Sequence, residues 1–323
     1  MLVDGSSTIT PDTPQLQKAF GQPKGQKKGC GFPVPKVLGL FDAFTGLVVE
    51  MLSFPLYTHE QSKVWLLHPL LKAGDLLVAD RGFCSFAHLA MLCSRGVPAC
   101  FRMHQRQVVD FRPHRKARDA CAKGRRKGRP TSAFVRRLGR HDQVVRWKKP
   151  AWHQKPAWMS DGQYDALPEG LEVRELRYTL ACKGQRTRCV TIATTLLDPA
   201  AYPGEKVAEL YGIRWRVETH FAQLKTTLKM RKVKSHTAQG VKKELAVYCL
   251  VYNLVHAVMA EAAARQAVEP DRISFIDAVR WLLIGRARPA AAGPGGEPAA
   301  SRPARAARDQ GPAGHLHEDD QAP

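Results

Sequence analysis

Acidic residues are scarce in this sequence. It holds 29 Asp and Glu against 50 Lys and Arg in 323 residues, which gives a formal net charge of +21. Such an excess of positive charge says more about the partners of a protein than about its fold, and it favours a polyanion such as nucleic acid. A chain of this length can bury a sizeable core, so its size does not exclude an enzyme.

Paired cysteines are also missing. The eight cysteines are scattered without a C-x-x-C pair, a pattern that fits neither a zinc ribbon nor a disulfide-stapled secreted domain. We expect reduced thiols that lie mostly in the core. The 12 histidines form no metal constellation, and no cysteine has a histidine at a spacing typical of a nucleophilic enzyme.

Long apolar runs are few, and a signal peptide is not visible. The longest run, residues 245–260, contains Asn253 and His256 and is shorter than the roughly 20 residues that a membrane span needs. We therefore expect a buried helix there and no membrane partner. The N-terminus "MLVDGSSTIT" lacks a basic start followed by an apolar stretch, so a cytoplasmic location is expected.

Short apolar runs and glycine turns alternate in the first third of the chain. Residues 36–54 are typical of two strands joined by a turn at 42–46. The run "GDLLVAD" at 74–80 indicates a buried strand whose last residue emerges at the edge of a sheet. A helix at 85–95 and a strand at 97–102 follow. This order predicts an α/β fold with a mixed sheet flanked by helices.

The remaining segments are expected to be strands in 174–198, helices in 205–265 and 274–285, and a disordered tail in 286–323. Between 102 and 149 the chain carries 17 Lys or Arg against Asp110, Asp119 and Asp142. Charge runs are most often solvated faces. The density of this one favours binding to DNA phosphates, where each contact adds salt-dependent affinity.

One acid, Glu218, lies in the otherwise basic stretch 211–230. On a helix at about 100° per residue, Tyr211, Arg214, Glu218 and Lys225 fall within a sector of about 60°. The adjoining apolar face comprises Leu210, Val217, Phe221, Leu224 and Leu228. The polar stripe should therefore border the buried side of the helix.

Two readings of Glu218 remain open. It can pair with Arg214 four residues earlier, a contact worth only about 0.2–0.5 kcal/mol on a surface helix. It can also join Asp4 and Asp80, which follow apolar runs and look like acids at strand ends. Three carboxylates suit Mg²⁺, and a pair of ions about 3.5–4 Å apart supports displacement at phosphorus.

These residues carry a family likeness. Tyr211, Arg214, Glu218 and Lys225 match the Y-x2-R-x3-E-x6-K signature of the DDE transposases of bacterial insertion sequences. "VDGS" at Asp4 resembles the first acidic motif of that family and "VADRGF" the second. The likeness extends over about residues 3–285.

The resemblance implies an RNase H-like catalytic domain in 1–285, with a basic, β-rich insertion at about 103–200. It implies that Asp4, Asp80 and Glu218 hold two Mg²⁺ ions, for which Mn²⁺ can substitute. Tyr211, Arg214 and Lys225 would then contact DNA. The implied reaction is cleavage of transposon ends and joining of the 3′-hydroxyls to target DNA, in a homodimer or larger assembly within a bacterial cell.

The chain departs from this branch in lacking the substantial region that usually precedes the first acidic motif. Only Met1, Leu2 and Val3 stand before Asp4, so the first core strand is expected to be nearly absent. Either the start of the sequence is misassigned, or the chain is a truncated, non-catalytic DNA-binding remnant. A separate alternative to a transposase is a nuclease on the same core that cuts without joining.

Overall fold

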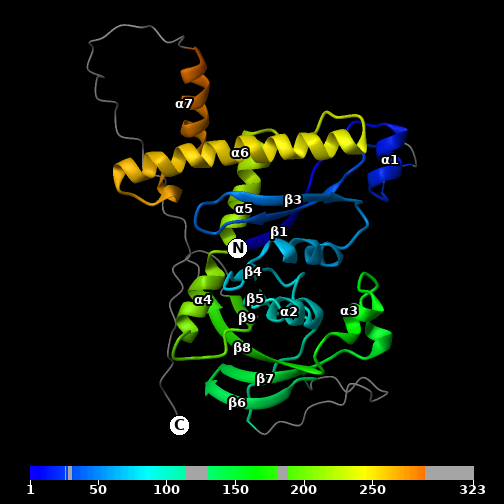
Figure 1. Cartoon of the computed structure of the whole chain (residues 1–323), viewed down its shortest axis with the longest axis vertical. Helices are drawn as coiled ribbons and strands as arrows, with labels where there is room; N and C mark the ends of the chain where they lie inside the picture. The colour runs from blue at the N-terminus through cyan, green and yellow to red at the C-terminus, as the bar shows by residue number, and fades with distance from the viewer. Residues whose placement is uncertain (26, 28–30, 114–129, 181–187, 288–323) are drawn as a thin grey trace. The chain divides into compact units, whose positions relative to one another are not determined.

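The computed structural model describes residues 1–25, 27, 31–113, 130–180 and 188–287 (Figure 1). Its internal contacts divide the described residues into two compact units. The first comprises Met1–Gly5 and Tyr57–Glu218, and the second comprises Ser6–Leu56 and the described residues after Glu218.

A mixed β-sheet runs through the first unit. Its strands are β1 (Leu2–Ser7), which continues into the second unit at Ser6, β4 (Leu77–Ala79), β5 (Ala99–Arg102), β6 (Ala133–Gly139), β7 (Asp142–Lys148), β8 (Gly170–Leu180) and β9 (Arg188–Thr194). Their spatial order is β1-β4-β5-β9-β8-β7-β6. The pairs β1–β4 and β4–β5 are parallel, whereas every later pair is antiparallel.

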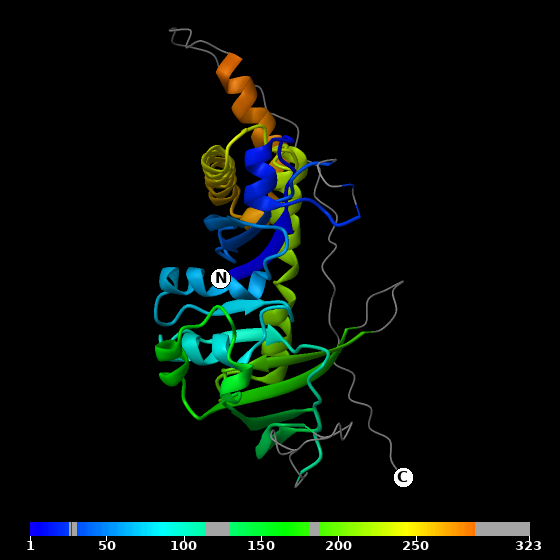
Figure 2. The same cartoon turned by 90° about the vertical axis from the view of Figure 1, so that its right-hand side faces the viewer.

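Helices cover both faces of this sheet. The helices α2 (Phe86–Cys93) and α4 (Gly204–Gly212) pack on β5 from opposite sides (Figure 2). The first turn of α2 is capped by Ser85, whose hydroxyl accepts a hydrogen bond from the backbone N–H of His88. The other helical segments of the unit are η1 (Glu60–Ser62), η2 (Val64–Leu70), η3 (Trp152–Gln154), α3 (Asp161–Asp165) and the first half of α5 (Trp215–Ala222).

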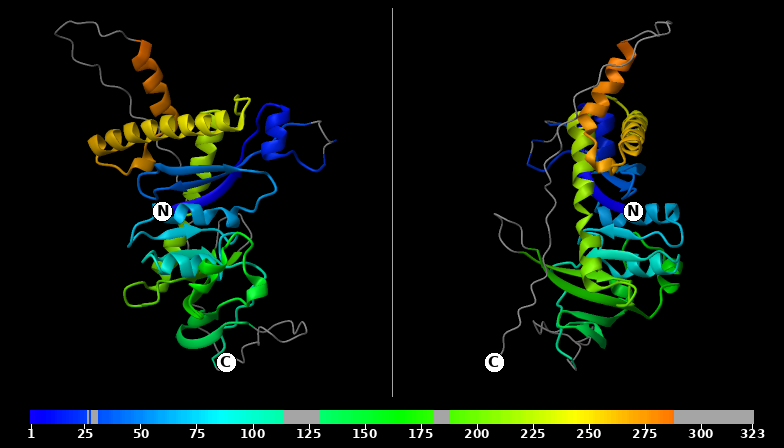
Figure 3. Two further views of the ribbon diagram at one scale, coloured as in Figure 1. Left: turned by 45° about the vertical axis from the view of Figure 1, so that its right-hand side comes forward. Right: turned by 90° about the vertical axis from the view of Figure 1, so that its left-hand side faces the viewer.

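The second unit is built on a β-hairpin and a long helix. The antiparallel strands β2 (Lys36–Phe41) and β3 (Val48–Phe54) form the hairpin, and α6 (Ala238–Gln266) lies along β3 (Figure 3). Its other elements are α1 (Pro14–Phe20), the π-helical turn η4 (Gln223–Thr227), η5 (Pro270–Arg272) and α7 (Phe275–Ala287). Phe41, Phe221 and Tyr252 meet edge to face in the core of this unit.

Most of the expected elements are confirmed. The α/β class, the mixed sheet flanked by helices and the hairpin at 36–54 are all present. The β-rich insertion expected in 103–200 contains β6 to β9. The tail expected at 286–323 lies outside the described residues, apart from Arg286 and Ala287, which end α7.

Two expectations about the ends of helices and strands are wrong. β1 is a strand of six residues, and Asp4 lies inside it instead of opening a turn. Its residues 2 and 3 pair with β4. The stretch 211–230 is not one helix, because α4 ends at Gly212 and α5 begins at Trp215.

The prediction of a buried helix at 245–260 is wrong for one of its faces. Leu245, Tyr252 and Val255 are buried, but Leu250 and Leu254 are more than half exposed. The helix also has 29 residues, so the length of the apolar run does not exclude a span. Of the helices in the described ranges, α6 alone has the length and mean hydropathy for crossing a membrane, a property shared by core helices of soluble proteins.

The cysteines are less buried than expected. Cys84 and Cys100 lie in the core, but Cys93 and Cys249 are partly exposed and Cys189 is exposed. These five thiols are free, as predicted. Cys30, Cys121 and Cys182 lie outside the described residues.

Candidate active site

Two of the predicted acids, Asp4 and Asp80, lie next to each other toward the carboxyl ends of the parallel strands β1 and β4. In the β1–β4 pair Val3 is opposite Ala79. Asp4 is the next residue of β1, and Asp80 is the first residue after β4. Since neighbouring parallel strands lie about 4.8 Å apart, the two carboxylates project from adjacent positions. The N–H of Gly5 donates to Oδ1 of Asp4 over 2.8 Å.

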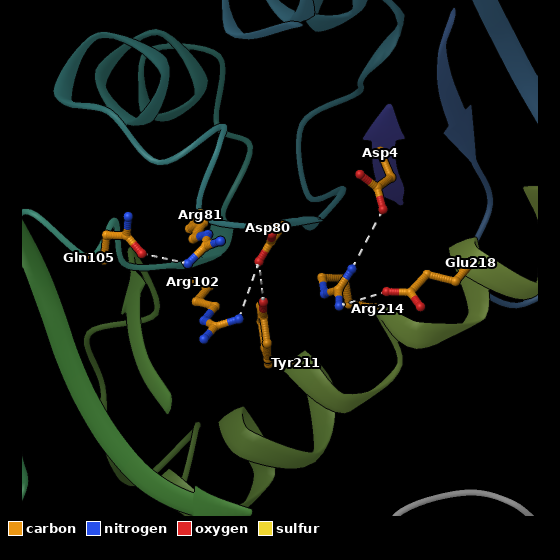
Figure 4. A network of polar contacts seen from close by, with 8 residues as sticks. All are labelled: Asp4, Asp80, Arg81, Arg102, Gln105, Tyr211, Arg214 and Glu218. Carbon is orange, nitrogen blue, oxygen red and sulfur yellow. Dashed lines mark hydrogen bonds and ion pairs between the residues drawn. The ribbon is translucent and has the colours of Figure 1, made fainter. Parts of the chain in front are cut away.

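The third predicted acid, Glu218, is connected to Asp4 by the side chain of Arg214. Arg214 lies between α4 and α5, and its side chain is almost fully buried. Its Nη1 is 3.6 Å from Oδ2 of Asp4, and its Nη2 is 3.1 Å from Oε1 of Glu218 (Figure 4). Although the predicted helix is interrupted, Arg214 therefore links Glu218 to Asp4.

Asp80 has a separate set of partners. The hydroxyl of Tyr211 donates to Oδ1 of Asp80 over 3.3 Å, and Nη1 of Arg102 lies 3.9 Å from the same oxygen. Arg102, the last residue of β5, was not among the residues singled out from the sequence. The available signal was its place at the end of the strand that follows Asp80, since neighbouring parallel strands end at the same edge of a sheet.

Lys225 lies in the second unit, within the π-helical turn η4. Its Nζ donates to Oγ of Ser6 over 3.0 Å, and Ser6 is the second residue after Asp4 in β1. Partial burial and the nearby charge of Arg231 lower the pKa of Lys225. Single-turn π-helices occur often at functional sites.

Comparison with known proteins identifies the family. Residues 1–254 match the family model described as "Transposase DDE domain". The chain belongs to the DDE transposase family.

One curated transposase and one solved structure are similar to parts of this chain. The chain is 23% identical over 289 residues to the transposase InsG for insertion sequence element IS4 of Escherichia coli (strain K12). This alignment covers 88% of the chain and 57% of InsG. A solved structure of the piggyBac transposase synaptic complex with hairpin DNA aligns with 11% identity and a TM-score of 0.43, over 88% of this chain and 52% of that chain. The chain spans little more than half the length of each of these two proteins.

The electrostatics of this candidate site are set by burial and by its two arginines. Burial raises the pKa of Asp4 from 3.8 to about 6, although the Gly5 N–H and the charge of Arg214 oppose this shift. The charges of Asp80 and Glu60 add to it. Burial also raises the pKa of Tyr211 far above its usual range, so its hydroxyl stays protonated and can donate to Asp80.

The donor atoms at this site suit a hard divalent cation. Carboxylate oxygens are the ligands that Mg²⁺ takes in proteins, and adjacent parallel strands supply two of them. Among the described residues, however, no three acidic, His or Cys side chains form a ready metal cage. The guanidinium of Arg214 contacts both Asp4 and Glu218, so a cation shared by these two acids requires Arg214 to release at least one of them.

Proposed function

We propose that this chain is the RNase H-like catalytic domain, residues 1–285, of an insertion-sequence transposase that cleaves the ends of its element and joins them to target DNA. The observation that supports this most directly is the meeting of Asp4, Asp80 and Glu218 around Arg214 in a member of the DDE family. In this proposal the three acids hold two Mg²⁺ ions, or Mn²⁺ in their place. Ions held by these acids would supply Lewis-acid stabilisation of the charge that develops during displacement at phosphorus.

The cations of the site would hold the phosphate that undergoes displacement. Arg214 and Arg102 present planar guanidinium groups, which match phosphate oxygens in a bidentate way. Tyr211 would orient Asp80, since its hydroxyl donates to that carboxylate. Lys225 would contribute a further positive charge to the DNA backbone.

The insertion would bind DNA away from the reacting phosphate. Its described strands β6 and β7 and the turn between them carry exposed Arg136, Arg137, Arg140 and Arg146. Such a group of exposed arginines is suited to phosphates along a DNA backbone. We expect the protein to act as a homodimer or larger assembly on DNA in the bacterial cytoplasm.

Cleavage of labelled terminal repeats of the element in Mg²⁺ would test the proposed reaction. The chain would be fused to the additional region that its longer relatives contain. Asp80→Ala and Glu218→Ala should each abolish the cleaved product, whereas the matched control Asp165→Ala, an exposed acid on α3, should not. Unchanged cleavage in both site variants would contradict the proposal.

A non-catalytic DNA-binding remnant is the second candidate function. It is favoured by Arg214, which neutralises two of the three acids in the structure. This candidate predicts DNA binding that weakens with salt and yields no metal-dependent product. A nuclease without joining activity would give cleaved ends but no joined product from labelled 3′ ends.

A further inference from the structure

The helix α6 has an apolar stripe on its exposed side. Its residues Val247, Leu250, Val251 and Leu254 are 57%, 60%, 40% and 56% exposed, and we call them the α6 seam. Their spacing of i, i+3, i+4 and i+7 places them on one face of the helix. The core face of the same helix packs on β3 (Figure 3). The seam is therefore a second apolar face, which no described part of the chain buries.

Charged residues continue the seam at both ends. Lys243 lies one turn before Val247, and Glu261 lies two turns after Leu254, so both fall on the same face of the helix. Both side chains are exposed. Glu261 also accepts a hydrogen bond over 2.8 Å from Nε of Arg265, which lies one turn further along the helix from the seam.

The order of charges makes the seam complementary to itself in one orientation. Lys243 and Glu261 lie at equal distances along the chain from Tyr252, and so do Leu250 and Leu254. Two copies related by a two-fold axis at Tyr252, with their helices antiparallel, would place each Lys243 opposite the Glu261 of the other copy. A parallel arrangement would instead set Lys243 against Lys243.

We propose that a second copy of this chain packs on the α6 seam, with the two α6 helices antiparallel. The interface is isologous, so each seam serves as its own partner. It deepens the assembly suggested under the proposed function, and it rests on that suggestion only for its biological role. The acid Glu261 at one end of the stripe would be repelled by an anionic lipid surface, whereas a second copy offers it Lys243, which favours a protein partner. The area that four side chains of each copy can bury is smaller than the roughly 1,600 Å² of a standard interface, so the dimer should dissociate on dilution.

Sedimentation velocity over a concentration series, without DNA or metal, would measure this association. Leu250→Glu should raise the dimer dissociation constant at least tenfold, because it places two carboxylates in the apolar part of the interface. The matched control Phe44→Glu changes an 84% exposed aromatic residue in the β2–β3 turn and should leave the constant unchanged. Far-UV circular dichroism would verify that both variants fold.

Charge reversal tests the antiparallel orientation. Lys243→Glu alone and Glu261→Lys alone each create two like-charged contacts, so each should weaken the dimer roughly threefold to tenfold. The double variant restores opposite charges and should recover the parental constant. A monomer at every concentration, equal constants in all four proteins, or sedimentation with anionic vesicles in place of self-association would overturn the proposal. Because no assay here involves DNA, failure of the catalytic proposal would leave these results unaffected.

Discussion

The raised pKa of Asp4 predicts that this site lowers the stability of the protein. Since the pKa of Asp4 is 3.8 in its reference state and about 6 in the fold, the folded state binds the proton more tightly. The contribution of Asp4 to stability is therefore greatest below pH 3.8, and it is lost as the pH rises from there through about 6. At 1.36 kcal/mol per pKa unit, the full loss is about 3 kcal/mol. Asp4→Asn removes the charge while keeping an acceptor for the Gly5 N–H, so it should recover this free energy.

Urea unfolding in the presence of EDTA would measure the effect. At pH 8 we expect Asp4→Asn to raise the free energy of unfolding by about 3 kcal/mol, and at pH 5 by about half as much. In thermal unfolding the gain at pH 8 corresponds to roughly 6–12 °C. Asp165→Asn, at an exposed position on α3, is the matched control and should show neither change. If Asp4→Asn were no more stable than the parent at pH 8, burial would not be the dominant influence on Asp4.

Three further predictions concern other charged and polar groups. Asp142→Asn should destabilise the insertion by about 3–5 kcal/mol in urea unfolding, because it leaves the buried guanidinium of Arg174 without its ion pair. Burial lowers the pKa of His68 to about 3 and that of His88 to about 4. As the pH drops below 6.5, these side chains bind protons in the unfolded protein but not yet in the folded one, so the free energy of unfolding should fall. His68→Leu should make this decline shallower, and an unchanged slope would contradict the assignment. Tyr211→Phe removes the donor to Asp80 and should slow cleavage roughly tenfold, with unfolding by urea little changed.

Local patterns in the sequence were sufficient for the main elements. The run before Asp80 forms β4, and the segment 85–95 contains the buried helix α2, because apolar runs and glycine turns specify strands and helices locally. The spacing of Tyr211, Arg214 and Glu218 also indicated a shared face. That expectation assumed one unbroken helix, whereas α4 and α5 are separated by Ile213 and Arg214, of which Ile213 keeps right-handed helical dihedral angles.

Contacts between distant segments decided the rest of the site. The parallel pairing of β1 with β4 sets Asp4 beside Asp80, and the chain order of the two strands does not reveal it. The approach of Arg102 to Asp80 likewise depends on β5 lying next to β4. No short-range pattern reports which strands become neighbours, because that choice minimises the exposed apolar surface of the whole unit.

The sequence by itself determined the excess of positive charge, the α/β class and the motifs that place this chain among the DDE transposases. Only the tertiary structure decided that Arg214 joins Asp4 to Glu218 and that α6 keeps one apolar face exposed. The physical reason is that residue type and periodicity record the preference of a side chain for burial. Whether that preference is met depends on the partner surface that the rest of the fold provides.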